Sequence, residues 1–211
     1  MSAYYFNHQY ISNSDLRAFR VKMGLAREMP ENMQAIYDFG ELFHKSILEP
    51  NRITEEEREH PDFELAQTMA KQFWKDPICR QFAMASDFER EKEFYNADVA
   101  VGPYLFSGRA KMDGARTKIR YMLELKGLGV STQKQFEEGL VALDYDQAVA
   151  HYQATSGYEL SLMVGISKRR EALFRRIVKR YDDWYLNGEQ KLIDNLTLLR
   201  EWSPEDVRMA S

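Results

Sequence analysis

Three consecutive segments in the middle of the chain are rich in the aromatic and β-branched residues that favour extended structure. They cover Lys92 to Val101, Tyr104 to Met112 and Lys118 to Leu125, and their apolar positions partly alternate. Gly102-Pro103 separates the first two, and Asp113-Gly114-Ala115-Arg116 supplies turn-forming residues before the third. The sequence therefore predicts an antiparallel meander of three strands.

Helical patterns surround this meander. The clearest lies between Asn32 and Leu48, where apolar positions recur every three or four residues until Pro50. The acidic run Glu55-Glu56-Glu57 is either a solvated loop or the start of a helix. The other predicted helices are Asp15 to about Gly24, Phe63 to Trp74, Pro77 to Ser86, Gln133 to Gly139, Tyr145 to Thr155, and Asp182 to Trp202 with a break near Asn187-Gly188.

Two more strands, Leu160 to Ser167 and Ala172 to Arg180, are predicted on either side of a turn at Lys168-Arg169-Arg170. This order of elements indicates an α/β (α+β) fold with a mixed central sheet flanked by helices. The 211 residues, 44% of them hydrophobic, suffice for one core, and we expect one domain spanning residues 1–211.

Charge and cysteine content exclude several classes of protein. The net charge of -4 does not suit a protein that coats DNA, so any nucleic-acid contact must be local. A single cysteine, Cys79, excludes an internal disulfide framework and a four-cysteine metal site. We find no signal-peptide pattern and no run of roughly 18 apolar residues, and therefore expect a soluble, cytoplasmic protein without a membrane partner.

Asp113, Glu124 and Lys126 form the pattern with the clearest chemical meaning. Residues two apart on a strand point to the same face, so Glu124 and Lys126 should project together while Leu125 faces the other side. A hairpin can bring Asp113 beside them. Two carboxylates at one point suit Mg²⁺ or Mn²⁺, and the lysine would orient an attacking water or neutralise charge on an attacked phosphate.

An acidic residue two before a lysine also describes an ordinary surface ion pair, and Glu189-Gln190-Lys191 repeats the pattern. That second occurrence lies in a helical segment, where residues two apart do not share a face. The first follows the apolar run Tyr121-Met122-Leu123 and precedes Gly127 and Gly129. Its setting favours a site over an ion pair.

These residues carry a family resemblance. The segments Gly108-Arg109-Ala110-Lys111-Met112-Asp113-Gly114 and Leu123-Glu124-Leu125-Lys126-Gly127 resemble the Asp…(Asp/Glu)-x-Lys core of the PD-(D/E)XK nuclease superfamily, in the branch of exonuclease VIII, the RecB nuclease domain and related phage exonucleases. Three flanking segments are similar in the same order: Ile11 to Leu16, Phe39 to Pro50 with a Gly-x-x-x-His helix, and Asp144 to Tyr152 with a glutamine helix.

The resemblance implies a restriction-endonuclease-like core and a Mg²⁺- or Mn²⁺-dependent exodeoxyribonuclease of DNA recombination or repair, in a bacterial or phage-infected cell. It implies metal ligation by His44, Asp113, Glu124 and the backbone carbonyl of Leu125, with Lys126 acting on the water. Gly40 lies one helical turn before His44, and we expect its missing side chain to let this helix approach the sheet closely. The implied partner is linear double-stranded DNA. Assembly into a homo-oligomer and a single-strand-annealing partner protein are open. The alternative is a catalytically silent DNA-binding or assembly module of this family.

The chain departs from the family at the glutamine helix. The family has tyrosine four residues after the glutamine, whereas here Gln147 is followed at that spacing by His151, with Tyr152 one later. The resemblance implies that Gln147 and the tyrosine contact DNA or support the metal ligands. Either His151 replaces the tyrosine or Tyr152 reaches the site from a rotated helix. The family's carboxylate upstream of the hairpin is either Glu93, which we rank first, or Glu91.

Two further segments are candidates for DNA contact. Lys168 to Arg180 holds seven basic residues and only Glu171 as an acid, which suits either phosphate binding or a solvated hairpin. Near the N-terminus, aromatic side chains are available either for stacking on bases or for packing: Tyr4, Tyr5, Phe6 and Tyr10.

Overall fold

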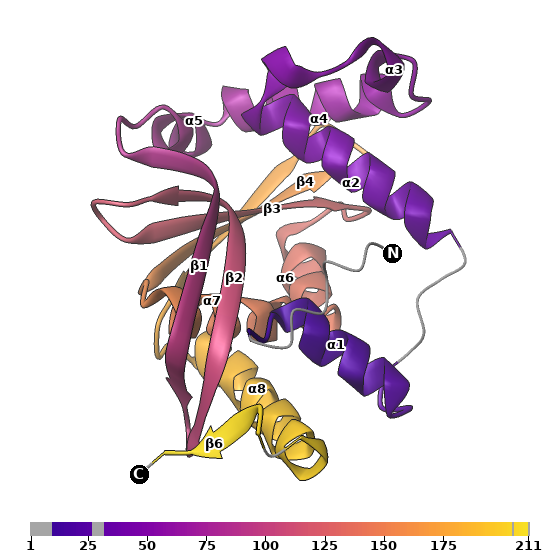
Figure 1. The fold of residues 1–211 in the computed structure, drawn as a ribbon. Coiled ribbons are helices and arrows are strands. Elements are labelled where there is room, and N and C mark those ends of the chain that lie inside the picture. Colours follow the sequence, from indigo (N-terminus) through magenta and orange to yellow (C-terminus); the bar gives the residue numbers. More distant parts are fainter. Residues whose placement is uncertain (1–9, 27–31, 204, 211) are drawn as a thin grey trace.

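The computed structural model describes residues 10–26, 32–203 and 205–210. Helices flank one twisted sheet, which confirms the mixed architecture expected from the sequence (Figure 1). The helices are α1 (Asn13–Lys22), α2 (Met33–Leu48), the 3-10 helix η2 (Pro50–Arg52), α3 (Glu55–Arg58), α4 (Phe63–Lys75), α5 (Pro77–Ala83), α6 (Gln133–Ala142), α7 (Tyr145–Ser156) and α8 (Asp183–Trp202). The strands are β1 (Phe88–Val101), β2 (Tyr104–Arg116), β3 (Tyr121–Leu128), β4 (Leu160–Ser167), β5 (Leu173–Lys179) and β6 (Val207–Met209).

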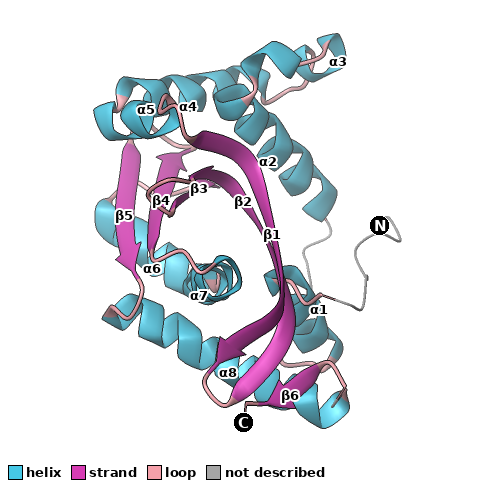
Figure 2. Ribbon diagram, turned by 60° about the vertical axis from the view of Figure 1, so that its left-hand side comes forward, coloured by secondary structure: helices cyan, strands magenta, loops and turns pink. Residues whose placement is uncertain are grey.

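The strands lie side by side in the order β1-β2-β3-β4-β5, and β6 pairs with the start of β2. The first three form the predicted antiparallel meander, and β4 and β5 form an antiparallel hairpin. β3 and β4 run parallel, with α6 and α7 in the connection between them, as parallel neighbours require. The sheet is therefore mixed, and it curves around α7, which Figure 2 shows almost end-on.

Alternate side chains of β3 enter two hydrophobic cores on opposite faces of the sheet. Leu123 and Leu125 pack with α2, α4 and α5, whereas Met122 packs with α6, α7 and α8. Glu124 and Lys126 share the face of Met122, as the period of two predicts. A third core joins the far halves of β1 and β2 to α1, α8 and β6.

The turn between β2 and β3 lies later than the sequence indicates. Asp113 to Arg116 were expected to form it, but β2 continues to Arg116 and the chain turns at residues 117–120. The expected turn residues are instead paired, with Gly114 opposite Leu123 and Arg116 opposite Tyr121. Asp87 fixes the real turn, because its carboxylate accepts bonds from Arg116 Nε at 2.5 Å and from the backbone N–H of Lys118 at 3.1 Å.

The last helix runs without the break expected near Gly188. This glycine instead allows α8 to approach α7 closely, because a Cβ atom at Gly188 would lie 2.2 Å from the backbone oxygen of Asp146.

Two smaller elements complete the comparison with the sequence. Glu55 starts the short helix α3, which Thr54 caps, and the strand β6 was not expected at all. None of the described helices has the length and apolar character needed to cross a membrane.

Candidate metal-dependent active site

β2 and β3 separate beside Asp113, and this opening shapes the candidate site. Pairing between the two strands ends at Gly114 and Leu123. Beyond that point Asp113 Oδ2 accepts the backbone N–H of Leu125 at 2.6 Å. A buried backbone N–H without an acceptor is costly, so the Asp113 carboxylate replaces a bond that a paired strand would supply.

His44 connects α2 to the same opening. Its Nδ1 atom lies 2.9 Å from Asp113 Oδ1, and its Nε2 atom lies 3.1 Å from the carbonyl oxygen of Leu125. Both ring nitrogens thus face acceptors, an arrangement that is satisfied when both carry hydrogen. Burial would lower the pKa of His44, but the Asp113 carboxylate outweighs that effect and raises the pKa above its ordinary value.

Glu124 and Lys126 form a buried ion pair on the face of β3 that looks toward α7. Lys126 Nζ donates to Glu124 Oε2 at 3.0 Å. The Lys126 side chain is 17% exposed and the Glu124 side chain is 5% exposed. Burial raises the pKa of Glu124, and the lysine offsets only part of that rise. The other carboxylate oxygen of Glu124, Oε1, is buried and has no hydrogen-bond partner within the described chain.

Tyr145 and Tyr152 lie seven residues apart on α7 and both act on this ion pair. The ammonium group of Lys126 lies 4.9 Å from the ring centroid of Tyr145. Burial raises the pKa of the Tyr152 hydroxyl, the negative charges of Glu124 and Asp113 raise it further, and Lys126 partly offsets the rise. Of His151 and Tyr152, only Tyr152 has a pKa that responds to the charges of the candidate site. Tyr145 was not foreseen, although positions seven apart share a helix face.

The oxygen atoms at this opening suit a hard divalent cation. The unpartnered Glu124 Oε1, the Asp113 carboxylate and the Leu125 carbonyl are the ligand types that Mg²⁺ and Mn²⁺ prefer. The side chains do not form a complete ligand set in this structure. Within the described residues, no group of three His, Cys, Asp or Glu side chains is arranged to hold a metal. His44, which the resemblance implies as a further ligand, has both ring nitrogens in contact with Asp113 and the Leu125 carbonyl.

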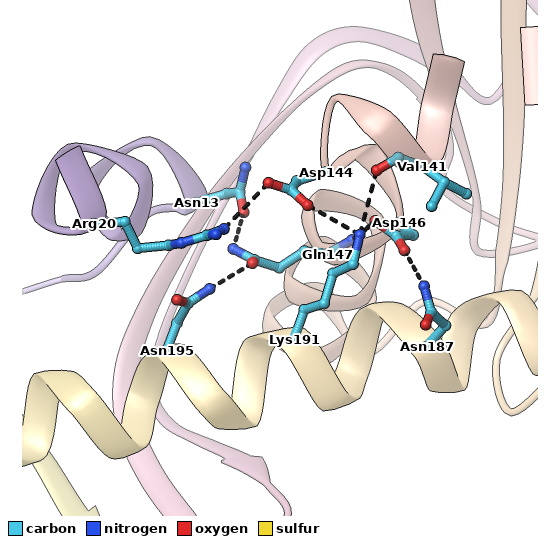
Figure 3. Close-up of polar contacts among 9 residues, drawn as sticks. All are labelled: Asn13, Arg20, Val141, Asp144, Asp146, Gln147, Asn187, Lys191 and Asn195. Carbon is cyan, nitrogen blue, oxygen red and sulfur yellow. Dashed lines mark hydrogen bonds and ion pairs between the residues drawn. The ribbon is translucent and has the colours of Figure 1, made fainter. Parts of the chain in front are cut away.

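Gln147 does not face the metal-site candidates. Its side-chain amide donates to Asn13 Oδ1 at 2.9 Å and its oxygen accepts from Asn195 Nδ2 at 2.5 Å, so it links α7 to α1 and α8 (Figure 3). The side chain is buried, and both ends are occupied by protein partners. This geometry supports a structural role for Gln147 rather than the DNA contact that the resemblance implies.

His151 also points away from the candidate site. Its Nε2 atom donates to the carbonyl oxygen of Ile11 at 3.1 Å, and its ring packs beside Phe106. The ring is fully buried and Nδ1 has no partner among the described residues. Burial therefore lowers the pKa of His151 to about 4, and the ring is neutral in the folded protein at neutral pH.

This buried ring predicts that stability declines in mild acid. Because the folded pKa of about 4 lies below the ordinary 6.5, the unfolded chain binds the proton more readily. The contribution is complete above pH 6.5 and is lost as the pH falls toward 4, by up to about 3 kcal/mol. Urea unfolding at several pH values should show a shallower decline for His151→Gln, whose amide can still donate to Ile11. Equal declines in both proteins would contradict the assignment.

Two other expectations about the site's surroundings are not supported. Glu93 is exposed and accepts a bond from Tyr95 at 3.1 Å, while Glu91 pairs with Lys111 at 3.2 Å, so neither is seen to join the Asp113 cluster. Gly40 was expected to let α2 approach the sheet closely, but a Cβ atom there would meet nothing within 4 Å. The space over Gly40, one helical turn before His44, is open.

The aromatic residues near the N-terminus are only partly described. Tyr10 packs edge-on against Tyr95, with ring centroids 5.4 Å apart, which favours the packing interpretation for this residue. Tyr4, Tyr5 and Phe6 lie outside the described residues.

Comparison with known proteins adds little to this geometry. No family model matches the sequence, and no curated protein matches it. Among solved structures, the chain is similar to one titled "Crystal structure of SSO0001", with 13% identity, a TM-score of 0.39, and coverage of 91% of this chain and 88% of the other. That likeness is too weak to support a statement about fold or function.

Proposed function

We propose that this chain is a metal-dependent DNA nuclease, and more narrowly an exodeoxyribonuclease that acts on linear duplex DNA. The observation that carries the proposal is the buried Glu124–Lys126 pair beside Asp113 and His44, with one Glu124 oxygen unpartnered. Burying charged groups without full pairing is costly, and such clusters occur preferentially at functional sites. The narrower assignment, including a role in recombination or repair, rests on the resemblance of the ordered motifs.

The residues divide the chemistry between them. Asp113, Glu124 and the Leu125 carbonyl would hold the cation, which when bound supplies Lewis-acid polarisation of the phosphate and a more acidic water. Lys126 places a positive charge where charge develops on the attacked phosphate. Glu124 and the Tyr145 ring hold the lysine in place, at 3.0 Å and 4.9 Å.

One observation favours the alternative of a catalytically silent DNA-binding module. Asp113, His44 and Leu125 satisfy one another's hydrogen bonds in a closed set, which a purely structural role would also explain. Such a role leaves the Glu124–Lys126 pair without a purpose, since apolar residues of similar size would be as stable at that position. We therefore favour the enzyme.

Digestion of DNA by the purified protein tests the proposal. End-labelled linear duplex and covalently closed circular DNA are incubated with Mg²⁺, with Mn²⁺ and with EDTA. We expect cleavage of the linear substrate that requires metal and is lost in Lys126→Ala, while the circle persists. Cleavage of both substrates would retain the nuclease and reject the exonuclease. No cleavage with either metal, together with unchanged behaviour of Lys126→Ala, would reject the enzyme.

A further inference from the structure

The turn between β4 and β5 presents three consecutive basic residues, Lys168, Arg169 and Arg170. Ser167 holds the turn in shape, because its hydroxyl accepts the backbone N–H groups of Arg169 at 3.1 Å and Arg170 at 3.3 Å. The same hydroxyl donates to the carbonyl of Val130 at 2.6 Å. The three cations therefore extend from an ordered turn rather than from a loose loop.

The structure separates these three from two other basic residues of the same hairpin, Arg175 and Arg176. Arg175 pairs with Asp76 at 3.0 Å and Arg176 pairs with Glu137 at 3.5 Å, so both are used within the protein. In contrast, none of the three turn residues forms an ion pair within the described chain, and Arg169 and Arg170 are exposed.

The nearby acids do not cancel the charge of the turn. The carboxylate of Glu171 accepts from Gln72 at 3.0 Å and lies 3.7 Å from Lys75, and both partners come from α4. Asp62 is close enough to act on the pKa of Lys168 but forms no ion pair with it. The turn therefore keeps a local surplus of positive charge on a protein whose net charge is -4.

This turn lies next to the candidate active site. Lys168 donates its backbone N–H to Leu128 at 2.8 Å, and Leu128 follows Lys126 by two residues on β3. That separation is about 7 Å along the backbone of β3. The Lys168 ammonium group lies 3.8 Å from the ring centroid of Phe39, which ties the turn to α2, the helix that carries His44. In Figure 1 both β3 and β4 end close to α2.

We propose that the β4–β5 turn binds the phosphate backbone of a DNA strand that is held at the candidate active site. The side chains of Lys168 and Arg169 lie directly against Gly127 and Gly129. A Cβ atom on Gly127 would lie 3.3 Å from Lys168 Cε, and one on Gly129 would lie 3.5 Å from Arg169 Nε. Arginine fork geometry suits phosphate oxygens, and such contacts position DNA without reading its sequence. The placement of that strand at the active site rests on the proposed nuclease function; the phosphate contact itself does not.

The salt dependence of DNA binding tests this inference apart from cleavage. Fluorescence anisotropy measures the Kd of labelled linear duplex with Ca²⁺ in place of Mg²⁺. The salt concentration is varied from about 50 to about 200 mM, because binding through phosphate contacts weakens strongly over that range. For Arg169→Gln/Arg170→Gln we expect Kd to rise about tenfold at the lower salt, and the slope of log Kd against log salt to fall by about 1.8, since each phosphate contact contributes about 0.9.

A matched control removes two cations from the opposite end of the same sheet. Lys118 and Lys179 are exposed, and they lie where β3 begins and where β5 ends. Lys118→Gln/Lys179→Gln should keep the wild-type Kd and slope. An equal loss in both variants, or no loss in the turn variant, would overturn the inference. A loss confined to the turn variant, in a protein that cleaves nothing with Mg²⁺ or Mn²⁺, would support the phosphate contact while rejecting the nuclease.

Discussion

Replacing Glu124 with glutamine is expected to lower the rate of DNA cleavage about a thousand-fold, or about 4 kcal/mol in the activation barrier. Glutamine has nearly the same shape and can still accept the Lys126 bond, so the side chain keeps its 3.0 Å contact. What it loses is the negative charge that a divalent cation requires at the buried Oε1 position. Initial rates on linear duplex DNA at saturating Mg²⁺, with circular dichroism to verify folding, provide the measurement.

The second Glu-x-Lys segment of the chain supplies the control. Glu189 lies on α8 and accepts a bond from the hydroxyl of Tyr185 at 2.9 Å, away from the candidate site. The same substitution there, Glu189→Gln, should leave cleavage within about twofold of the wild-type rate, since surface changes rarely exceed about 0.5 kcal/mol. If Glu124→Gln retains more than a tenth of the activity, Glu124 is not a ligand of the catalytic metal.

Replacing Gly188 with alanine is expected to lower the free energy of unfolding by about 3 kcal/mol, at the upper end of overpacking effects. The added Cβ atom would meet the backbone of α7, with the Asp146 oxygen at 2.2 Å and the Gln147 nitrogen at 2.9 Å. Backbone atoms cannot rotate away as a side chain can, so the two helices must separate.

Separation of these helices would also disturb a buried polar network (Figure 3). Asp146 is fully buried and pairs with Lys191 at 3.0 Å and with the side-chain amide of Asn187. A buried charge that loses its partner is strongly destabilising. Urea unfolding gives the measurement.

A second helical glycine provides the reference for that experiment. A Cβ atom at Gly139, in α6, would meet nothing within 4 Å. Gly139→Ala should raise the free energy of unfolding by about 0.5 to 1 kcal/mol, because alanine loses less conformational entropy in a helix. If Gly188→Ala is stabilising as well, the close approach of α7 and α8 is wrong.

Period and composition were sufficient to predict most of the fold. The three strands of the meander, the β4–β5 hairpin and the helix from Met33 to Leu48 follow from local spacing of apolar side chains, because each buries one face. Element ends were less predictable. Asp113 to Arg116 have the composition of a turn, yet pairing with β3 and the Asp87 bonds to the true turn keep them in β2.

The candidate site was also only partly predictable from local sequence. Strand geometry alone placed Glu124 and Lys126 on one face, and that geometry is present in the structure. By contrast, the side chains that α7 sends toward the site depend on the rotation of that helix. Packing of α7 against α1 and α8 turns Gln147 and His151 into buried contacts and brings Tyr145 and Tyr152 to Lys126.

The sequence by itself determined which residues share a strand face and where charge gathers along the chain, because these properties follow from periods of two and from residue type. Only the tertiary structure decided that β2 leaves β3 beside Asp113, that His44 of α2 fills that opening, and that Arg175 and Arg176 form ion pairs while the basic residues of the β4–β5 turn form none within the described chain. These features depend on contacts between distant segments, such as His44 with Leu125, 81 residues apart, and no local pattern encodes the distance or direction of such contacts.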